Sequence, residues 1–141
     1  MHFTIHADGG SRGNPGPAGA GAIVRDHLGN SVAAVSQFLG TRTNNYAEYE
    51  AVILAFTALA KLIGTRGASA ATVEVKMDSE LVVKQMKGVY KVKHPTMKAQ
   101  FARLMEAKAA FKDVSFTHVP RAQNADADAL ANEAMDRGAN L

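Results

Sequence analysis

The 141-residue sequence predicts an α/β protein whose mixed β-sheet is flanked by helices. The order of patterns along the chain supports this fold class. Three strand-like segments come first, and helix-like and strand-like segments then alternate, which is typical of a sheet with an antiparallel hairpin and parallel strands. The hydrophobic content of 47% is enough for a buried core. We therefore expect a single domain over residues 1–141.

The first three strands lie in the N-terminal third of the chain. Apolar and polar residues alternate over residues 3–8, which predicts a strand that ends at Asp8. Residues 9–19 are rich in glycine and proline and predict a loop. Residues 20–25 and 31–38 predict two strands joined by a short Leu-Gly-Asn turn, that is, a hairpin.

The rest of the chain alternates between helix and strand patterns. Apolar residues from Tyr49 to Ile63 recur at helical spacing, and Gly64 is a plausible helix end. Pro95 favours the first turn of a later helix. The remaining expected elements are a strand over 72–77, helices over 79–87 and 95–111, a strand over 114–119 and a last helix over 124–137.

Positive charge is concentrated in one segment, although the net charge of +3 is small. Between Glu80 and Glu106 the sequence contains no acidic residue, but it contains Lys84, Lys87, Lys91, Lys93, Lys98 and Arg103. Such a run is compatible with a solvated helix face. It is equally compatible with a phosphate-binding surface, whose affinity would depend on salt through counterion release.

Several functional classes are disfavoured by composition. The chain has no cysteine, so a bound metal would need oxygen or histidine ligands. The N-terminus lacks a basic segment followed by an apolar signal core, and no apolar run approaches the roughly 18 residues of a membrane span, so we expect a cytoplasmic protein with no membrane partner. The glycine-rich segment has neither the Gly-Lys-Ser/Thr ending of a P-loop nor a complete dinucleotide fingerprint.

Four acidic residues stand where a metal site could form. Asp8 and Asp78 end predicted strands, and Glu48 and Asp128 lie near the starts of predicted helices. Converging carboxylates repel one another unless a cation such as Mg²⁺ or Mn²⁺ neutralises them. Each acid also has a structural alternative. The two aspartates at strand ends could start turns, Glu48 could complete a capping box with Asn45, and spacing does not choose between Asp128 and Asp126.

Four motifs span nearly the whole chain. They are Asp8-Gly-Gly-Ser-Arg-Gly-Asn-Pro-Gly-Pro-Ala-Gly19, Thr43-Asn-Asn-Tyr-Ala-Glu48, Asp78-Ser-Glu-Leu-Val82 and His118-Val-Pro-Arg-Ala-Gln-Asn124-Ala-Asp-Ala-Asp128-Ala-Leu-Ala131. These motifs resemble those of type 1 ribonuclease H. They occur in the family's order. The resemblance implies a ribonuclease H-like fold with a five-stranded sheet of order 3-2-1-4-5. It also implies that Asp128, not Asp126, is the fourth carboxylate.

The resemblance further implies the activity. Members of the family hydrolyse the RNA strand of an RNA–DNA hybrid with two Mg²⁺ ions, for which Mn²⁺ can substitute, and leave 5′-phosphate and 3′-hydroxyl ends. Asp8, Glu48, Asp78 and Asp128 would hold the metal ions. Little base specificity and a monomeric enzyme are expected. The alternatives are a catalytically silent hybrid-binding module and another nuclease of the same fold superfamily.

Substrate contacts carried over from the family cover several segments. The expected residues are Gly9, Ser11, Arg12, Gly13, Asn14, Asn44, Asn45, Ser79 and Asn124. The larger relatives have a tryptophan-rich basic protrusion, whereas this chain has no tryptophan, so we expect Lys91 and Lys93 to contact the DNA strand instead. Either His118 or Arg121 could assist turnover, and the sequence does not decide between them.

Overall fold

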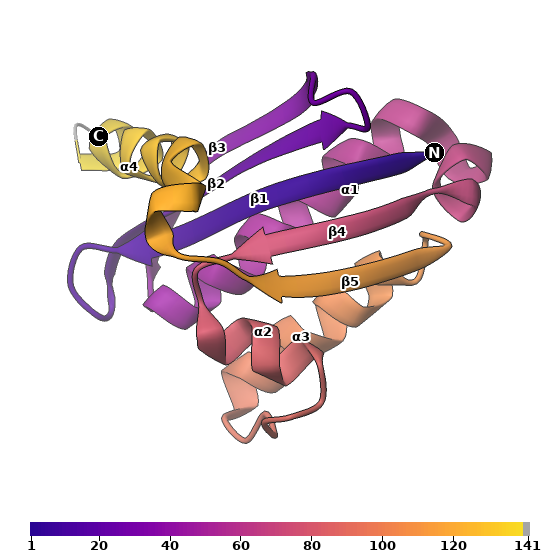
Figure 1. The fold of residues 1–141 in the computed structure, drawn as a ribbon. Helices are drawn as coiled ribbons and strands as arrows, with labels where there is room; N and C mark the ends of the chain where they lie inside the picture. The colour runs from indigo at the N-terminus through magenta and orange to yellow at the C-terminus, as the bar shows by residue number, and fades with distance from the viewer. Residues whose placement is uncertain (140–141) are drawn as a thin grey trace.

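The computed structural model describes residues 1–139 (Figure 1). Its elements in chain order are β1 (His2–Ser11), β2 (Gly16–Asp26), β3 (Ser31–Arg42), α1 (Asn44–Ala70), β4 (Thr72–Met77), α2 (Glu80–Met86), α3 (Pro95–Lys108), β5 (Asp113–His118), a 3₁₀ turn (Arg121–Asn124) and α4 (Ala125–Ala139). Every predicted strand and helix is present, although several boundaries differ.

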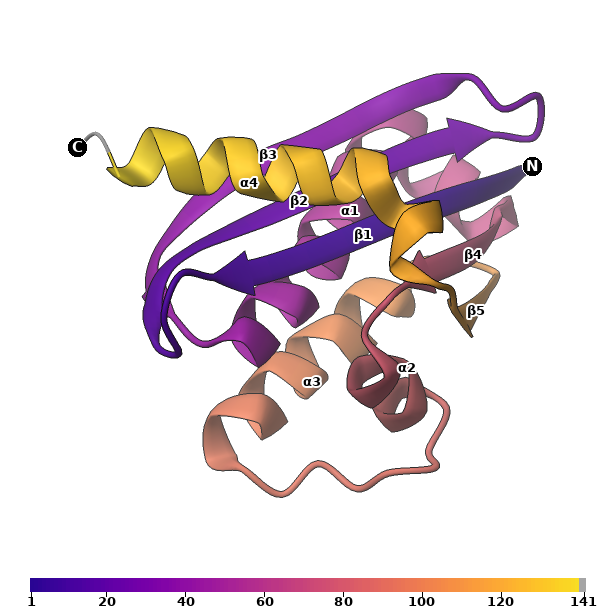
Figure 2. The same cartoon turned by 60° about the vertical axis from the view of Figure 1, so that its left-hand side comes forward.

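The five strands form one sheet in the order β3-β2-β1-β4-β5, as the resemblance implied. β1, β2 and β3 pair antiparallel, whereas β1, β4 and β5 run parallel to one another. α4 packs across one face of the β1–β3 part, and α1 packs on the opposite face with α3 against it (Figures 1 and 2). Because β1 is the central strand, it contacts helices on both faces.

The main core lies between the sheet and α1. Phe3, Ile5 and Ala7 of β1 are buried in the same hydrophobic cluster as Tyr49 and Phe56 of α1. Side chains alternate between faces along a strand, so the even-numbered residues of β1, Asp8 among them, lie on the face that α4 covers. The alternation read from the sequence therefore fixes the direction of the first acidic side chain.

The predicted loop over residues 9–19 is wrong in its extent. β1 continues to Ser11 and β2 begins at Gly16, so only residues 12–15 connect them. The glycines in these strands allow close packing of helices. A Cβ on Gly19 would lie 2.6 Å from the carbonyl oxygen of Ala131 in α4, a distance that real Cβ contacts do not show. Here the glycines bring helix and sheet together instead of forming a turn.

Helix α1 is longer than predicted. Gly64 has φ 76° and interrupts the helix, but the helix resumes and ends at Ala70. Its N-cap is Thr43, whose side chain accepts a hydrogen bond from the Tyr46 N–H, so the proposed capping box with Asn45 is wrong. By length and composition α1 could cross a membrane, contrary to the sequence-based expectation. In this fold it is the core helix between the sheet and α3.

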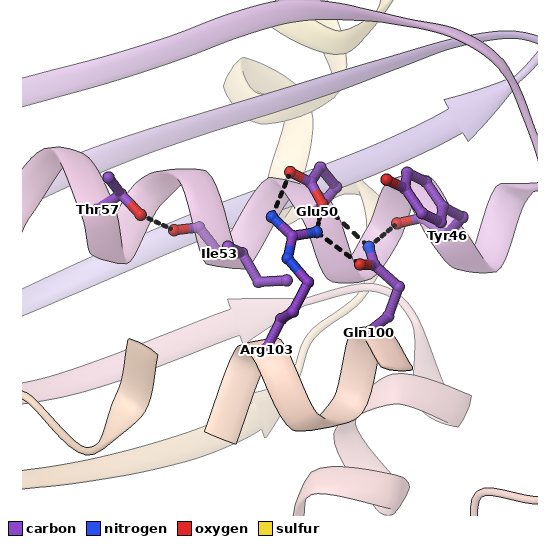
Figure 3. Close-up of polar contacts among 6 residues, drawn as sticks. All are labelled: Tyr46, Glu50, Ile53, Thr57, Gln100 and Arg103. Atoms are coloured by element: carbon purple, nitrogen blue, oxygen red, sulfur yellow. Dashed lines mark hydrogen bonds and ion pairs between the residues drawn. The ribbon is translucent and has the colours of Figure 1, made fainter. Parts of the chain in front are cut away.

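A buried polar cluster fixes α3 on α1 (Figure 3). The carboxylate of Glu50 accepts hydrogen bonds from both terminal nitrogens of Arg103, and also one from Gln100 Nε2 at 3.0 Å. Gln100 Nε2 donates a second bond to the carbonyl oxygen of Tyr46 at 3.2 Å. Glu50 is 7% exposed and Gln100 is 2% exposed. The middle of α3 is thereby held against α1.

Candidate active site

A pocket of about 450 Å³ lies at the end of the sheet where β1 and β4 finish. All four predicted acids line it: Asp8, Glu48, Asp78 and Asp128. They come from β1, α1, the residue after β4, and α4. The structure therefore brings together four carboxyl groups that lie up to 120 residues apart in the sequence.

Strand pairing places two of these acids next to each other. β1 and β4 are parallel neighbours with Ala7 opposite Met77, so Asp8 within β1 and Asp78 just after β4 follow paired residues at the same level of the sheet. The buried side chain of Asn124 donates a hydrogen bond of 2.8 Å to the carbonyl oxygen of Ala7. This bond ties the start of α4, which carries Asp128, to the end of β1.

Glycines bring the two flanking helices close enough to contribute their acids. A Cβ on Gly9 would overlap the backbone of Ala47 and Glu48 in α1, so only glycine fits there. On the other face, Gly21 pairs with Asp8 in the sheet and packs against Ala127 of α4. Glu48 and Asp128 can therefore approach Asp8 from opposite faces of the sheet.

The acids are crowded and partly buried, which perturbs their proton affinity. Burial raises the pKa of Asp8 to about 8, helped by hydrogen bonding to Asp128 and by the charges of Asp78, Asp128 and Glu48. Burial also raises the pKa of Glu48 to about 7, and the charge of Asp78 adds to the rise, whereas a hydrogen bond from Ser79 opposes it. A bound cation would reverse these effects by stabilising the ionised carboxylates.

The donor set fits a hard divalent cation. The acidic ligands offer only oxygen atoms, which Mg²⁺ and Mn²⁺ prefer. Within residues 1–139, no group of three histidine, aspartate or glutamate side chains is already arranged to hold an ion. The residues therefore fit the metal in the kind of ligand atom that they supply, and all four line one pocket.

Several predicted substrate contacts also line the pocket: Gly9, Ser11, Arg12, Asn44 and Asn45. The side chain of Asn44 is already engaged, since its Oδ1 accepts hydrogen bonds from the Ser11 N–H at 2.7 Å and from the Ser11 hydroxyl at 3.1 Å. Asn14 Oδ1 in turn accepts from the Asn44 N–H at 3.1 Å. These bonds hold the β1–β2 connection against the start of α1.

Other predicted contacts lie outside the pocket. Gly13 is an exposed residue of the β1–β2 connection, with φ 93°. Ser79 caps α2, where its hydroxyl accepts from the Val82 N–H at 3.3 Å. Asn124 is 1% exposed and holds β1, so its placement does not support a direct substrate contact. Lys91 and Lys93 are exposed in the segment between α2 and α3 (Figure 2).

The structure separates the two candidates for assisting turnover. Arg121 lines the pocket, and its Nη2 lies 3.4 Å from Oδ1 of Asp128. His118 is the exposed last residue of β5 and is not among the residues that line the pocket. The short 3₁₀ turn after β5 carries Arg121 back towards α4, which the sequence pattern did not indicate.

Two pocket residues were missed by the sequence reading. Asn132 and Met135 line the pocket from α4, one and two turns after Asp128. Their spacing from Asp128 could have predicted this, because residues four and seven positions apart share a helix face. Met135 fits as an apolar wall, whereas Asn132 donates from Nδ2 to Oδ2 of Asp128 at 3.3 Å.

Comparisons with known proteins agree with this geometry. Residues 6–134 match a family model described as "Reverse transcriptase-like". A bifunctional protein of Mycobacterium tuberculosis is 46% identical over 140 residues, which cover 99% of this chain but 37% of that protein. This chain thus spans little more than a third of that relative. A ribonuclease H of Dechloromonas aromatica is 31% identical over 94% of this chain and 92% of its own length.

A solved structure shares the whole fold. LC11-RNase H1, determined in complex with an RNA/DNA hybrid, superposes with a TM-score of 0.90 at 47% identity, covering 96% of this chain and 98% of that one. The family model spans the segments that supply all four acids. The chain belongs to the type 1 ribonuclease H family.

Proposed function

We propose that this chain hydrolyses the RNA strand of RNA–DNA hybrids with two divalent metal ions and leaves 5′-phosphate and 3′-hydroxyl ends. The observation that carries the proposal is the convergence of Asp8, Glu48, Asp78 and Asp128 on one open pocket. The relative LC11-RNase H1, solved with an RNA/DNA hybrid, supports this choice of substrate. Mg²⁺ is the expected ion, and Mn²⁺ the expected substitute.

The four carboxylates would hold the ions, which activate the attacking water and stabilise the leaving oxygen when bound. The protein's own groups prepare this arrangement. Asn124 and the parallel pairing of β1 with β4 fix the positions of Asp8 and Asp78, and Gly9 lets α1 bring Glu48 close. The Arg121 guanidinium beside Asp128 adds positive charge at the pocket edge, where a phosphate would lie.

Substrate recognition would come from polar groups around the pocket. Residues 9–12, Asn44 and Asn45 line the pocket and are suited to the 2′-hydroxyl and the minor groove. The exposed Lys91 and Lys93 would contact the backbone of the DNA strand. Contacts to sugars and phosphates do not read base sequence, so cleavage should show little base specificity.

The decisive experiment is cleavage of an RNA–DNA hybrid labelled separately on each strand, with Mg²⁺ or Mn²⁺. Wild-type protein should cut the RNA strand only, and Asp78→Asn should abolish the cuts while keeping the wild-type circular dichroism spectrum and hybrid affinity. Duplex RNA and duplex DNA of the same sequence serve as matched substrates. Hybrid binding without cleavage in either ion would replace the proposal with a silent binding module, and cleavage of duplex DNA would indicate a different nuclease.

A further inference from the structure

Asn132 contacts a predicted metal-binding carboxylate without being an acid itself. It lies one helical turn after Asp128 on α4, and its Nδ2 donates to Oδ2 of Asp128 at 3.3 Å. The other oxygen, Oδ1, lies 3.4 Å from Nη2 of Arg121. The Asp128 side chain is 30% exposed, so it is not fixed by burial alone. Its two oxygens are held from two directions.

Asn132 is itself held by the segment that joins β1 to β2. Nη2 of Arg12 donates to the carbonyl oxygen of Asn132 at 3.5 Å and pairs with Asp136 at 2.6 Å. Asp128, Asn132 and Asp136 are spaced by four residues and therefore share one face of α4. The arginine predicted to bind substrate thus contacts the same helix face that carries the fourth carboxylate.

Arg121 and Asn132 differ in what they offer to Asp128. Arg121 is 77% exposed and carries a full positive charge, so it competes electrostatically with a cation at Asp128. The amide of Asn132 is neutral and fixes one carboxylate oxygen without adding charge. Hydrogen-bond partners of this kind orient metal-binding carboxylates.

We propose that Asn132 is a positioning residue, which orients Asp128 so that its carboxylate can bind a divalent cation. The proposal rests on the proposed function, because it assumes that Asp128 binds metal. It predicts that loss of the Asn132 amide weakens cation binding at Asp128 even when no nucleic acid is present. It also predicts that catalysis is restored at high metal concentration, because the carboxylate itself remains.

Asn132→Ala tests this inference, since alanine favours the helix and removes only the amide. Mn²⁺ binding would be measured calorimetrically without substrate for wild type, N132A, N132Q, D136N and D128N. D128N should abolish one Mn²⁺ site, and N132A should lower the Mn²⁺ affinity of that same site by about tenfold. This is the lower end of the ~10- to 100-fold loss typical when a hydrogen-bond partner of a metal ligand is removed. N132Q keeps an amide and should recover most of the affinity. D136N breaks the Arg12 pair but keeps the Asn132 amide, so it should bind like wild type.

The metal dependence of cleavage supplies the second readout. N132A should need about tenfold more Mg²⁺ for half-maximal cleavage, with maximal kcat and hybrid KM near those of wild type. Equal Mn²⁺ affinity and equal Mg²⁺ dependence in N132A and wild type would overturn the inference while leaving the proposed function intact. A loss of affinity that N132Q does not restore would show a packing effect and would also overturn it. Wild-type protein that neither binds Mn²⁺ nor cleaves hybrid would instead refute the proposed function.

Discussion

Gly9 lies so close to Ala47 that no side chain fits between β1 and α1 at this point. The next residues on either side of this contact, Asp8 and Glu48, are two of the four acids. The approach of backbone to backbone therefore sets the distance between the strand that supplies the first acid and the helix that supplies the second. The sequence pattern placed Gly9 in a loop, but in the structure it sets the separation between β1 and α1 at the active site.

Replacing Gly9 with alanine should destabilise the protein by at least about 1–3 kcal/mol, because the added methyl group overlaps the backbone of Ala47. It should also lower kcat by displacing α1 and Glu48. Gly10→Ala is the matched control. A Cβ added at Gly10 would have Met135 Cε as its nearest neighbour at 3.6 Å, which is an ordinary van der Waals contact. Urea denaturation and cleavage rates should separate the two variants. A G9A protein as stable as G10A would contradict this account of Gly9.

The acids should make the metal-free protein less stable as the pH rises. The pKa values of Asp8 and Glu48 are raised to about 8 and about 7, so between pH 4 and 8 the folded state holds protons that the unfolded state has lost. The stabilisation is complete below pH 4 and is lost as the pH passes through the folded-state values. With EDTA present, we expect Tm to fall by roughly 5 °C or more over this range.

Glu48→Gln provides the comparison for this prediction, because His6 has a lowered pKa and acts in the opposite direction. The difference in Tm between wild type and E48Q isolates the carboxyl group and should change with pH between 5 and 8. Saturating Mg²⁺ should flatten the wild-type profile, since bound metal favours the ionised form. A difference that is constant with pH would show that Glu48 is not perturbed.

The parts of the site that follow local patterns could be predicted from sequence. Alternation predicted a first strand that carries Asp8 and a later strand followed by Asp78, and the parallel pairing of β1 with β4 brings these two acids together. The predicted end of the first strand at Asp8 was wrong, because β1 continues to Ser11. The extent of the loop over residues 9–19 was wrong because glycine serves both turns and close packing, and only the helix opposite distinguishes the two. The placement of Arg121 in the pocket depends on a 3₁₀ turn with no clear sequence signal, so the sequence could not predict it.

The Glu50 cluster should be a major contact between α1 and α3. Glu50→Ala leaves Gln100, which is 2% exposed, and Arg103 without their shared acceptor, so we expect a loss of about 1–3 kcal/mol. Glu133→Ala removes an exposed ion pair with Arg137 and should cost less than about 1 kcal/mol. Chemical denaturation measures both. Equal effects of the two substitutions would show that the Glu50 cluster contributes no more than a surface pair.

Arg121 should matter more than His118 for turnover. Its guanidinium lies 3.4 Å from Asp128 in the pocket, whereas His118 is exposed and is not among the lining residues. We expect Arg121→Ala to lower kcat by roughly tenfold or more through lost electrostatic stabilisation, and His118→Ala to remain within about twofold of wild type. Single-turnover cleavage at saturating enzyme separates this effect from substrate affinity. A slower H118A than R121A would reverse the assignment.

Lys91 and Lys93 lie in the exposed segment that precedes α3, and nothing acidic lies between Glu80 and Glu106 to neutralise them. If both contact phosphates of the DNA strand, K91A/K93A should raise KM and reduce the slope of log KM against log salt by about 0.9 per lost contact. The charge-matched control is K61A/K112A, which changes exposed lysines of α1 and of the residue before β5. The control should keep the wild-type slope, because long-range charge alone is screened beyond about 10 Å at 0.1 M salt. Equal slopes in both double variants would mean that the basic segment affects binding only through net charge and does not contact the hybrid.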